Sequence, residues 1–314
     1  MEEALYSDLG FFNTDQVRSD KEGDFLTSPE VSKYFGKIIR NWIHSESNLK
    51  NIIEIGSGTG SLIEQIGIKE ITAVELSSTA REELIKKGID THTTIDELTT
   101  KTSDLIFGNE ILDNIPCSIG LYKDEGWYEK VVLLEENSLA YGLRPIRNEE
   151  LDWINKNNIF PNEDYEFEIQ VNIDKFLNSV IKKINPEKIL LFDYGYEQKN
   201  RDKRMYSSLL RTYKNHHLSV DPIDDPGNVD ITYDVNFSSI SSELKYLGYD
   251  VTLKLQRDFL LDNGFNIFFD ELQEKYIDAE GIEKLKINSE LNGMKAIVDS
   301  NGLGGFYCLI AEKL

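Results

Sequence analysis

The sequence predicts an α/β fold whose centre is a doubly wound, mainly parallel sheet. From residue 51 onward, short apolar runs of β type alternate with amphipathic helical stretches, which is typical of βαβ units. A glycine-rich turn joins the first of these strands to the first helix. The chain of 314 residues contains 40% hydrophobic and 29% charged residues, so it has globular composition and can bury a large core.

The individual elements follow from apolar periodicity and capping signals. NIIEIG at 51–56 predicts the first strand, and ITAVEL at 71–76 predicts the second. The helix after the second strand has Ser77 or Ser78 as its N-cap, and Gly88 lies just past its end. The remaining predicted elements are helices at 61–66 and near 237–247, and strands at 104–112, 188–195, 249–256 and 305–313.

We expect a single domain over residues 1–314, because no internal repeat or low-complexity linker divides the chain. Several segments do not fit the alternation of strands and helices: an N-terminal segment at 1–50 and insertions at about 118–170, 196–235 and 260–300. Long insertions in such folds usually build the substrate side of the site.

Composition excludes several classes of protein. The formal net charge of −22 disfavours a surface that binds duplex nucleic acid, which needs cations. No apolar run reaches the ~20 residues of a membrane-spanning helix, and the opening MEEALYSDLG lacks the basic region of a signal peptide. Cys117 and Cys308 have no CxxC spacing, and no histidine forms a metal-ligand pattern with them. We therefore expect a soluble cytoplasmic protein that binds no nucleic acid, does not insert into membranes and holds no metal.

The strongest local signal is the loop after the first strand. Glu54 is followed by Gly56, Gly58 and Gly60 in the spacing G-x-G-x-G. Glycines allow a ligand to approach the backbone, and the following helix N-terminus offers unpaired N–H groups. A dinucleotide fingerprint needs G-x-G-x-x-G, but its third position falls on Ser61. The observed spacing, with an acidic residue two positions before the first glycine, is similar to the S-adenosylmethionine loop of class I methyltransferases.

Two further groups of polar residues follow the next strands. Glu75 closes the second strand, 19 positions after Gly56, where a carboxylate can accept both ribose hydroxyls of a nucleoside. The alternative is a turn whose glycines serve only packing. Asn109, Glu110 and Asp113 follow the third strand, at the sheet edge where ligands bind in doubly wound folds. The two carboxylates either cap a helix and face water or lie beside a substrate.

Longer motifs extend these signals over nearly the whole chain. GDFLTSPEVS begins at Gly23, VELS contains Glu75, DYGY begins at Asp193, and DPGNVDIT begins at Asp225. With these motifs the chain resembles the MidA family of S-adenosylmethionine-dependent methyltransferases. The best-known relatives in this family are mitochondrial complex I assembly factors that symmetrically dimethylate a protein arginine. The resemblance implies a Rossmann-like class I fold, S-adenosylmethionine as cofactor with S-adenosylhomocysteine as product, and a protein substrate, for which a respiratory-complex subunit is one candidate.

The resemblance, together with the chemistry of an arginine acceptor, suggests roles for particular residues. The cofactor would be held by Glu54, Gly56, Gly58, Gly60, Glu75, Asn109, Thr27 and Ser28. Glu110 and Asp113 would clamp the target guanidinium, because bidentate carboxylates localise its charge and expose one nitrogen to the methyl group. Asp24 belongs to a segment that would close over the cofactor. His216 could accept a proton near neutral pH, or it could be a loop histidine with a structural partner.

Two other functions stay open at the level of sequence. One is methylation of a small molecule, since a fold does not determine its substrate. The other is a non-catalytic assembly chaperone that retains the cofactor loop. The family has GTL where this chain has Ser208-Leu209-Leu210, so that this loop bears on the choice of substrate. The sequence does not specify the oligomeric state.

Overall fold

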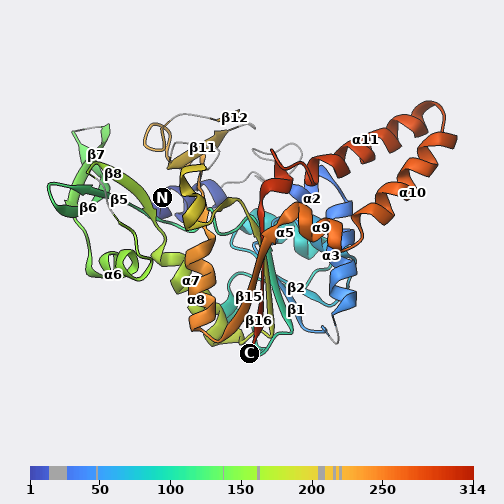
Figure 1. Cartoon of the computed structure of the whole chain (residues 1–314), viewed down its shortest axis with the longest axis horizontal. Helices are drawn as coiled ribbons and strands as arrows, with labels where there is room; N and C mark the ends of the chain where they lie inside the picture. Colours follow the sequence, from blue (N-terminus) through green and yellow to red (C-terminus); the bar gives the residue numbers. More distant parts are fainter. Residues whose placement is uncertain are drawn as a thin grey trace.

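The computed structural model describes residues 1–13, 27–46, 49–136, 138–160, 163–203, 209–214, 217–218 and 221–314. A central sheet carries helices on both faces, an antiparallel arm extends from one end, and a helical hairpin extends from the other (Figure 1). None of the helices in these ranges is long and apolar enough to cross a membrane.

The central sheet has seven strands in the order β15-β16-β9-β4-β1-β2-β3. The pairs from β9 to β3 are parallel, and β16 runs antiparallel to both of its neighbours. This topology confirms the predicted doubly wound, mainly parallel sheet. The strand bounds are β1 Ile52–Ile55, β2 Ile71–Val74, β3 Thr91–His92, β4 Leu105–Asn109, β9 Lys188–Asp193, β15 Tyr249–Leu255 and β16 Tyr307–Lys313.

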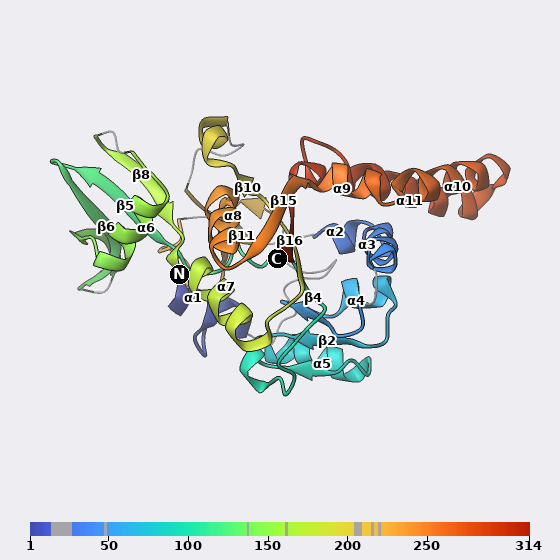
Figure 2. The same cartoon turned by 60° about the horizontal axis from the view of Figure 1, so that its bottom comes forward.

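Both faces of this sheet are buried, which explains why its strands are almost continuously apolar. Alternate strand residues such as Phe107 and Phe192 pack on one side against α3 (Tyr34–Ser45), α4 (Ser61–Ile66) and α9 (Gln256–Asp262). Their neighbours pack on the other side against α7 (Val171–Ile184) and α8 (Phe237–Tyr246), so that the two helix layers flank the sheet (Figure 2). Helix α5 (Ser78–Lys86) follows β2 and packs through Leu84.

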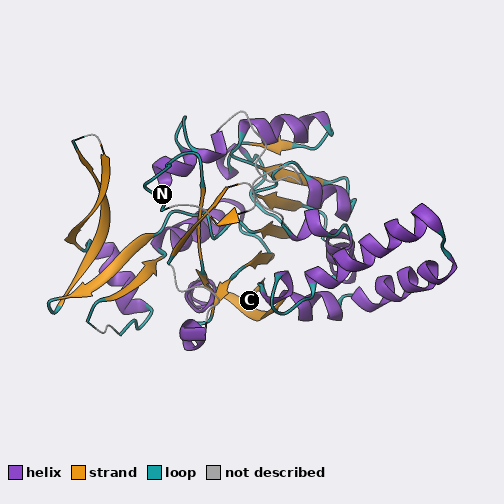
Figure 3. Cartoon of the chain, turned by 90° about the horizontal axis from the view of Figure 1, so that it is seen from above, coloured by secondary structure: helices purple, strands orange, loops and turns teal. Residues whose placement is uncertain are grey.

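The arm is a four-stranded antiparallel sheet in the order β7-β6-β5-β8. Its strands project away from the central sheet (Figure 3). Helix α6 (Asn148–Lys156) covers one of its faces, where Trp153 packs with Trp127 and Phe167. The strand bounds are β5 Ser118–Lys123, β6 Gly126–Glu135, β7 Ser138–Pro145 and β8 Tyr165–Ile169.

The other elements decorate the sheet. Helices α10 (Phe265–Asp278) and α11 (Gly281–Ile297) form the protruding hairpin, and α11 contacts α2 (Ser28–Val31) at its base. Strands β11 (Leu210–Lys214), β12 (His217–Leu218) and β13 (Asp230–Tyr233) form a small antiparallel sheet. The shortest elements are α1 Glu2–Tyr6, η1 Phe11–Asn13, η2 Ile95–Glu97, β10 Gly195–Tyr196, η3 Gln198–Lys203, β14 Val235–Asn236 and η4 Leu303–Gly305.

Candidate functional site

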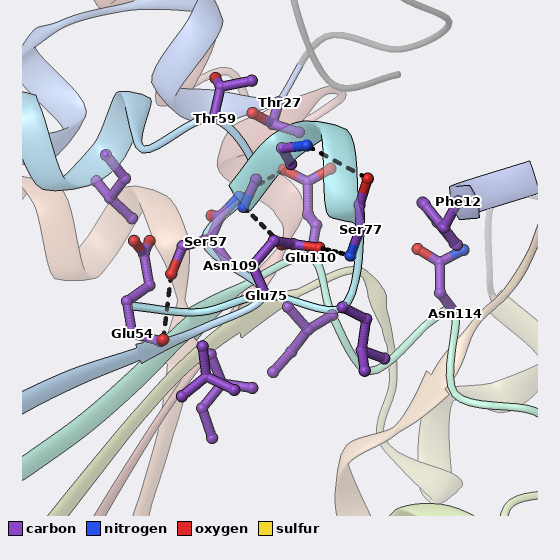
Figure 4. Close-up of a pocket in the computed structure, with 18 of the residues that line it drawn as sticks. Phe12, Thr27, Glu54, Ser57, Thr59, Glu75, Ser77, Asn109, Glu110 and Asn114 are labelled. Carbon is purple, nitrogen blue, oxygen red and sulfur yellow. Dashed lines mark hydrogen bonds between the residues drawn. The ribbon is translucent and has the colours of Figure 1, made fainter. Parts of the chain in front are cut away.

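A cavity of about 340 Å³ opens at the carboxyl ends of β1, β2 and β4 (Figure 4). The strand order reverses direction between β1 and β4, and this is where doubly wound folds bind ligands. The cavity is lined by Tyr6, Phe12, Thr27, Pro29, Glu30, Glu54, Ile55, Gly56, Ser57, Gly58, Thr59, Ser61, Leu62, Val74, Glu75, Leu76, Ser77, Ala80, Asn109, Glu110, Ile111, Asn114, Ile115, Pro116 and Phe176.

The loop from Gly56 to Gly60 forms the floor of the cavity, and its conformation requires glycine. Gly56 and Gly60 have φ angles of +70° and +82°, which side chains rarely adopt. A Cβ on Gly56 would lie 2.3 Å from Cγ2 of Ile111, and one on Gly60 would lie 2.7 Å from Cδ2 of Leu84. The absence of side chains on Gly56 and Gly60 therefore leaves room for a ligand and lets Ile111 and Leu84 pack against the loop.

Glu75 directly follows β2 and holds this loop in place. Its Oε2 accepts a hydrogen bond of 2.8 Å from the N–H of Gly58, and its Oε1 accepts one of 2.7 Å from the N–H of Ser77 (Figure 4). Burial raises the pKa of Glu75, although these backbone donors oppose the shift. The carboxylate is thus oriented at the cavity wall, with further lone pairs for ligand hydroxyls.

Glu54 lies beneath the loop and is only 2% exposed. Burial raises the pKa of its carboxyl well above the usual value. Its Oε2 has no hydrogen-bond partner among the described residues, and the same is true of Oδ1 of Asn109. Unsatisfied buried acceptors are costly, so two of them at one cavity indicate a ligand that carries donors.

Helix α2 forms the wall opposite the sheet. Thr27 lines the cavity and caps this helix together with Glu30, whose Oε2 accepts from the N–H of Thr27 at 3.1 Å. Ser28 is fully buried behind the wall, where its hydroxyl contacts the Gln256 amide. Two more residues that the sequence analysis assigned to the site, Asp24 and His216, lie outside the described residues.

Glu110 points into the cavity from the end of β4. Its backbone has a φ of +53°, and its N–H donates to the Phe192 carbonyl at 2.8 Å. Its Oε1 accepts from the Asn109 side chain at 3.0 Å and from the N–H of Ser28 at 3.4 Å. Burial, reinforced by the nearby Asp113 carboxylate, raises the pKa of Glu110 to about 8.

The structure does not bring Asp113 to the cavity. Its Oδ2 accepts from the Tyr194 hydroxyl, and Arg211 lies near enough to lower its pKa, which burial nevertheless raises to about 6. Arg211 also pairs with Asp234 at 2.8 Å. The turn that separates the two carboxylates is fastened by Asp193, whose Oδ2 accepts from the backbone of Leu112 and Asp113. Asp113 therefore belongs to a buried network behind the site.

Sequence reasoning missed the residues that the N-terminal segment and α7 contribute. Tyr6 and Phe12 stack with ring centroids 5.5 Å apart, and both line the cavity together with Phe176. Tyr6 donates to the Asn114 carbonyl at 3.1 Å, which attaches this segment to the loop after β4. Nothing in the local sequence pattern connects these aromatic residues with the cavity.

These features fit S-adenosylmethionine. The Glu110 carboxyl complements its sulfonium charge, and the orphaned oxygen of Glu54 can accept from its ammonium group. Glu75 suits the ribose hydroxyls, and the exposed side chain of Leu76 beside Ala80 offers apolar contact to a base.

Gly56→Ala is expected to weaken binding of S-adenosylhomocysteine by tenfold or more, because the new methyl group meets Ile111 at the cavity floor. Gly88→Ala is the matched control, since Gly88 has a similar φ of +75° but nothing lies within 4 Å of its Cβ position. Calorimetric titration of both variants checks this. Equal losses would mean that backbone strain alone, and not the space at the floor, determines affinity.

Comparisons with known proteins agree with this geometry. Residues 36–252 match the profile of a family described as "Putative S-adenosyl-L-methionine-dependent methyltransferase". A COG1565 superfamily structure from Burkholderia thailandensis, bound to S-adenosyl-homocysteine, superposes with a TM-score of 0.83 at 21% identity. The superposition covers 100% of this chain and 86% of that one, which shows the shared fold.

Curated relatives share about a quarter of their aligned residues with this chain. The chain is 25% identical to the protein arginine methyltransferase NDUFAF7 homolog, mitochondrial, of Caenorhabditis elegans, over 81% of this chain and 68% of that protein. It is 24% identical to the Drosophila melanogaster homolog over 70% of this chain, and spans only 60% of that protein. The expected cytoplasmic location is wrong, because the relatives from worm, zebrafish and mouse are named as mitochondrial proteins.

Proposed function

The chain belongs to a family of S-adenosyl-L-methionine-dependent methyltransferases, and from this premise we propose that it methylates an arginine side chain of a protein. The observation that carries the proposal is the Glu110 carboxyl, which lies in the same cavity as the glycine loop and Glu75. The relatives named protein arginine methyltransferase support it. The family resemblance suggests a respiratory-complex subunit as the acceptor.

The chemistry follows from the acceptor. A guanidinium is a cation with delocalised lone pairs, so it is a poor nucleophile until its charge is localised. The cofactor supplies the methyl group, whose bond to sulfur breaks as the bond to nitrogen forms. Glu110 accepts two N–H bonds from the guanidinium and holds the third nitrogen free. Asp113 does not line the cavity, whereas Glu30, Glu54 and Glu75 do. Because Glu54 and Glu75 are assigned to the cofactor, the clamp that we propose pairs Glu110 with Glu30.

Glu110 can also accept the proton that the guanidinium loses. One N–H proton must leave the nitrogen once it carries the methyl group. Because its pKa is raised to about 8, the ionised Glu110 carboxylate is a stronger base than an ordinary glutamate. Ser28 and Asn109 hold the carboxylate by hydrogen bonds and so fix its position during transfer.

Activity should depend on the ionisation of Glu110. The carboxyl is neutral below its pKa of about 8 and ionised above it, and only the ionised form attracts a guanidinium. We therefore expect kcat/KM to fall about tenfold for each pH unit below this value, because kcat/KM reports the free enzyme. A Glu110→Gln variant should lose this limb of the profile. A parent profile that is flat between pH 6 and 8 would contradict the assignment.

Matched peptides test the choice of acceptor. An acetylated and amidated Gly-Arg-Gly tripeptide should gain methyl groups at millimolar concentration, and the corresponding Gly-Lys-Gly peptide should not. The reason is that a planar guanidinium fits bidentate carboxylates and an ammonium does not. Mass spectrometry measures both products, and preferential methylation of lysine would overturn the proposal.

A further inference from the structure

The apolar face of the β6–β7 hairpin is unusual for a surface strand pair. The strand register places Val132 opposite Tyr141 and Leu134 opposite Leu139, so these four side chains share one face with Leu143. Their exposed fractions range from 37% for Leu139 to 74% for Leu134. Trp127 points to the other face, which α6 covers. Among the described residues, no helix covers this patch of five residues, which we call the hairpin face.

The edge of the same sheet is also open. β7 is the last strand in the order β7-β6-β5-β8, and no described strand pairs with its outer edge. Between Ser138 and Leu143 it has neither a charged residue nor a proline, the usual protections of an edge strand. An edge of this kind can accept an additional strand from another polypeptide.

A series of contacts connects the hairpin face to the cavity. The Tyr141 hydroxyl donates to Asp221, which begins the loop at 221–228. At the far end of this loop, a Cβ on Gly227 would lie 2.8 Å from the Leu9 carbonyl oxygen, so the loop touches the N-terminal segment. That segment supplies Phe12 to the cavity wall, and the arm lies beside it in both views (Figures 1 and 2).

The surface between the hairpin face and the cavity suits a polypeptide with basic side chains. Leu9 is 88% exposed, and Asp221 and Asp224 are exposed acids on the connecting loop. Basic residues near a target arginine would complement these acids.

The size of the patch favours a transient contact. The hairpin face has five residues, whereas a stable interface takes roughly 20–30 residues from each partner. A second copy of this chain would need more surface, and a substrate that must leave after each turnover would not.

We propose that the hairpin face and the free edge of β7 dock an extended segment of the polypeptide substrate while its arginine enters the cavity. This inference rests on the proposed function and adds to it the surface that selects the protein. Docking at a distance from the reacting atoms lowers KM without altering the chemical step.

The test uses a charge-paired double variant, Leu134→Lys with Leu139→Glu. The two residues face each other, so opposite charges keep the hairpin paired while removing its apolar character. The matched control is Ile277→Lys with Ile282→Glu on the helical hairpin, where the exposed fractions are 75% and 73%. Neither pair touches the cavity, and calorimetry should give wild-type affinity for S-adenosylhomocysteine in both variants.

Two acceptors are compared: the Gly-Arg-Gly tripeptide, and the soluble protein of the source organism from which this gene has been deleted. For the hairpin variant we expect about a tenfold or larger loss of methylarginine formation in protein, and an unchanged rate with the tripeptide. The control variant should match the wild type with both acceptors. Equal rates for the hairpin variant and the control on protein would overturn the docking proposal alone. Absence of methylarginine with the wild-type enzyme would instead overturn the proposed function and the docking proposal with it.

Discussion

Replacement of Glu110 by glutamine is expected to lower kcat for methyl transfer by about a hundredfold or more, while affinity for S-adenosylhomocysteine stays within about threefold. The glutamine keeps the shape of the side chain and can still accept from Asn109 and Ser28. It cannot supply the negative charge that localises the guanidinium, and it is not a base. Steady-state kinetics with the arginine tripeptide, together with calorimetry, measures the two effects separately.

Asp113→Asn is the matched control for this variant. The Asp113 carboxylate binds Tyr194 behind the cavity wall, so its loss should reduce thermal stability and change kcat less than about threefold. If Asp113→Asn reduced kcat as much as Glu110→Gln, the proposed clamp of Glu110 and Glu30 would be wrong.

The pH dependence of folding stability provides a second test of Glu110. The pKa of Glu110 is higher in the folded chain than in the unfolded chain, so the folded state binds more protons between about pH 4.5 and 8. Stability contributed by this group therefore falls as pH rises through that window. Glu110→Gln should remove this loss of stability and raise Tm relative to the parent at pH 8. A raised Tm would also show that the variant loses activity for a reason other than unfolding.

Glu75→Gln should produce the largest loss of cofactor affinity, about a hundredfold, which corresponds to roughly 2.7 kcal/mol. The carboxylate accepts two backbone hydrogen bonds, from Gly58 and Ser77, and in our proposal its remaining lone pairs accept from the ribose hydroxyls. A glutamine has one acceptor oxygen and turns an N–H₂ donor toward one of these N–H groups. Calorimetric titration with S-adenosylhomocysteine measures the loss.

Glu83→Gln serves as the control for Glu75, because Glu83 is an acidic residue of the next helix, α5, that binds Lys86 at the surface. It should leave the affinity unchanged. Wild-type affinity in Glu75→Gln would show that the ribose does not lie at this carboxylate.

The parts of this fold that the sequence predicts are those that local pattern encodes. The apolar runs at 51–56, 71–76 and 188–195 became β1, β2 and β9, because strands buried on both faces have an unmistakable composition. The glycine loop and Glu75 could also be located, since each follows a strand and the loop has a backbone conformation that favours glycine.

The parts that could not be predicted depend on contacts between distant segments. Glu110 and Asp113 are three positions apart, a spacing that suits one face of a helix. The left-handed backbone at Glu110 prevents a helix, and Asp193 fastens the next turn, so the two carboxylates point into different environments. Likewise, nothing local to Phe12 reveals that it folds over the cavity, because β13 and its loop hold the N-terminal segment there.

The most direct test of the central claim follows labelled methyl groups from S-adenosylmethionine into an extract of the source organism that lacks this gene. The extract is separated into protein and small molecules, and the protein is hydrolysed in acid to free its amino acids. We predict that the label appears in methylated arginine, from a small number of protein bands, and that it disappears when Glu75→Gln replaces the wild type. Label in small molecules alone, or in a protein residue other than arginine, would contradict the proposal that this cavity methylates a protein arginine.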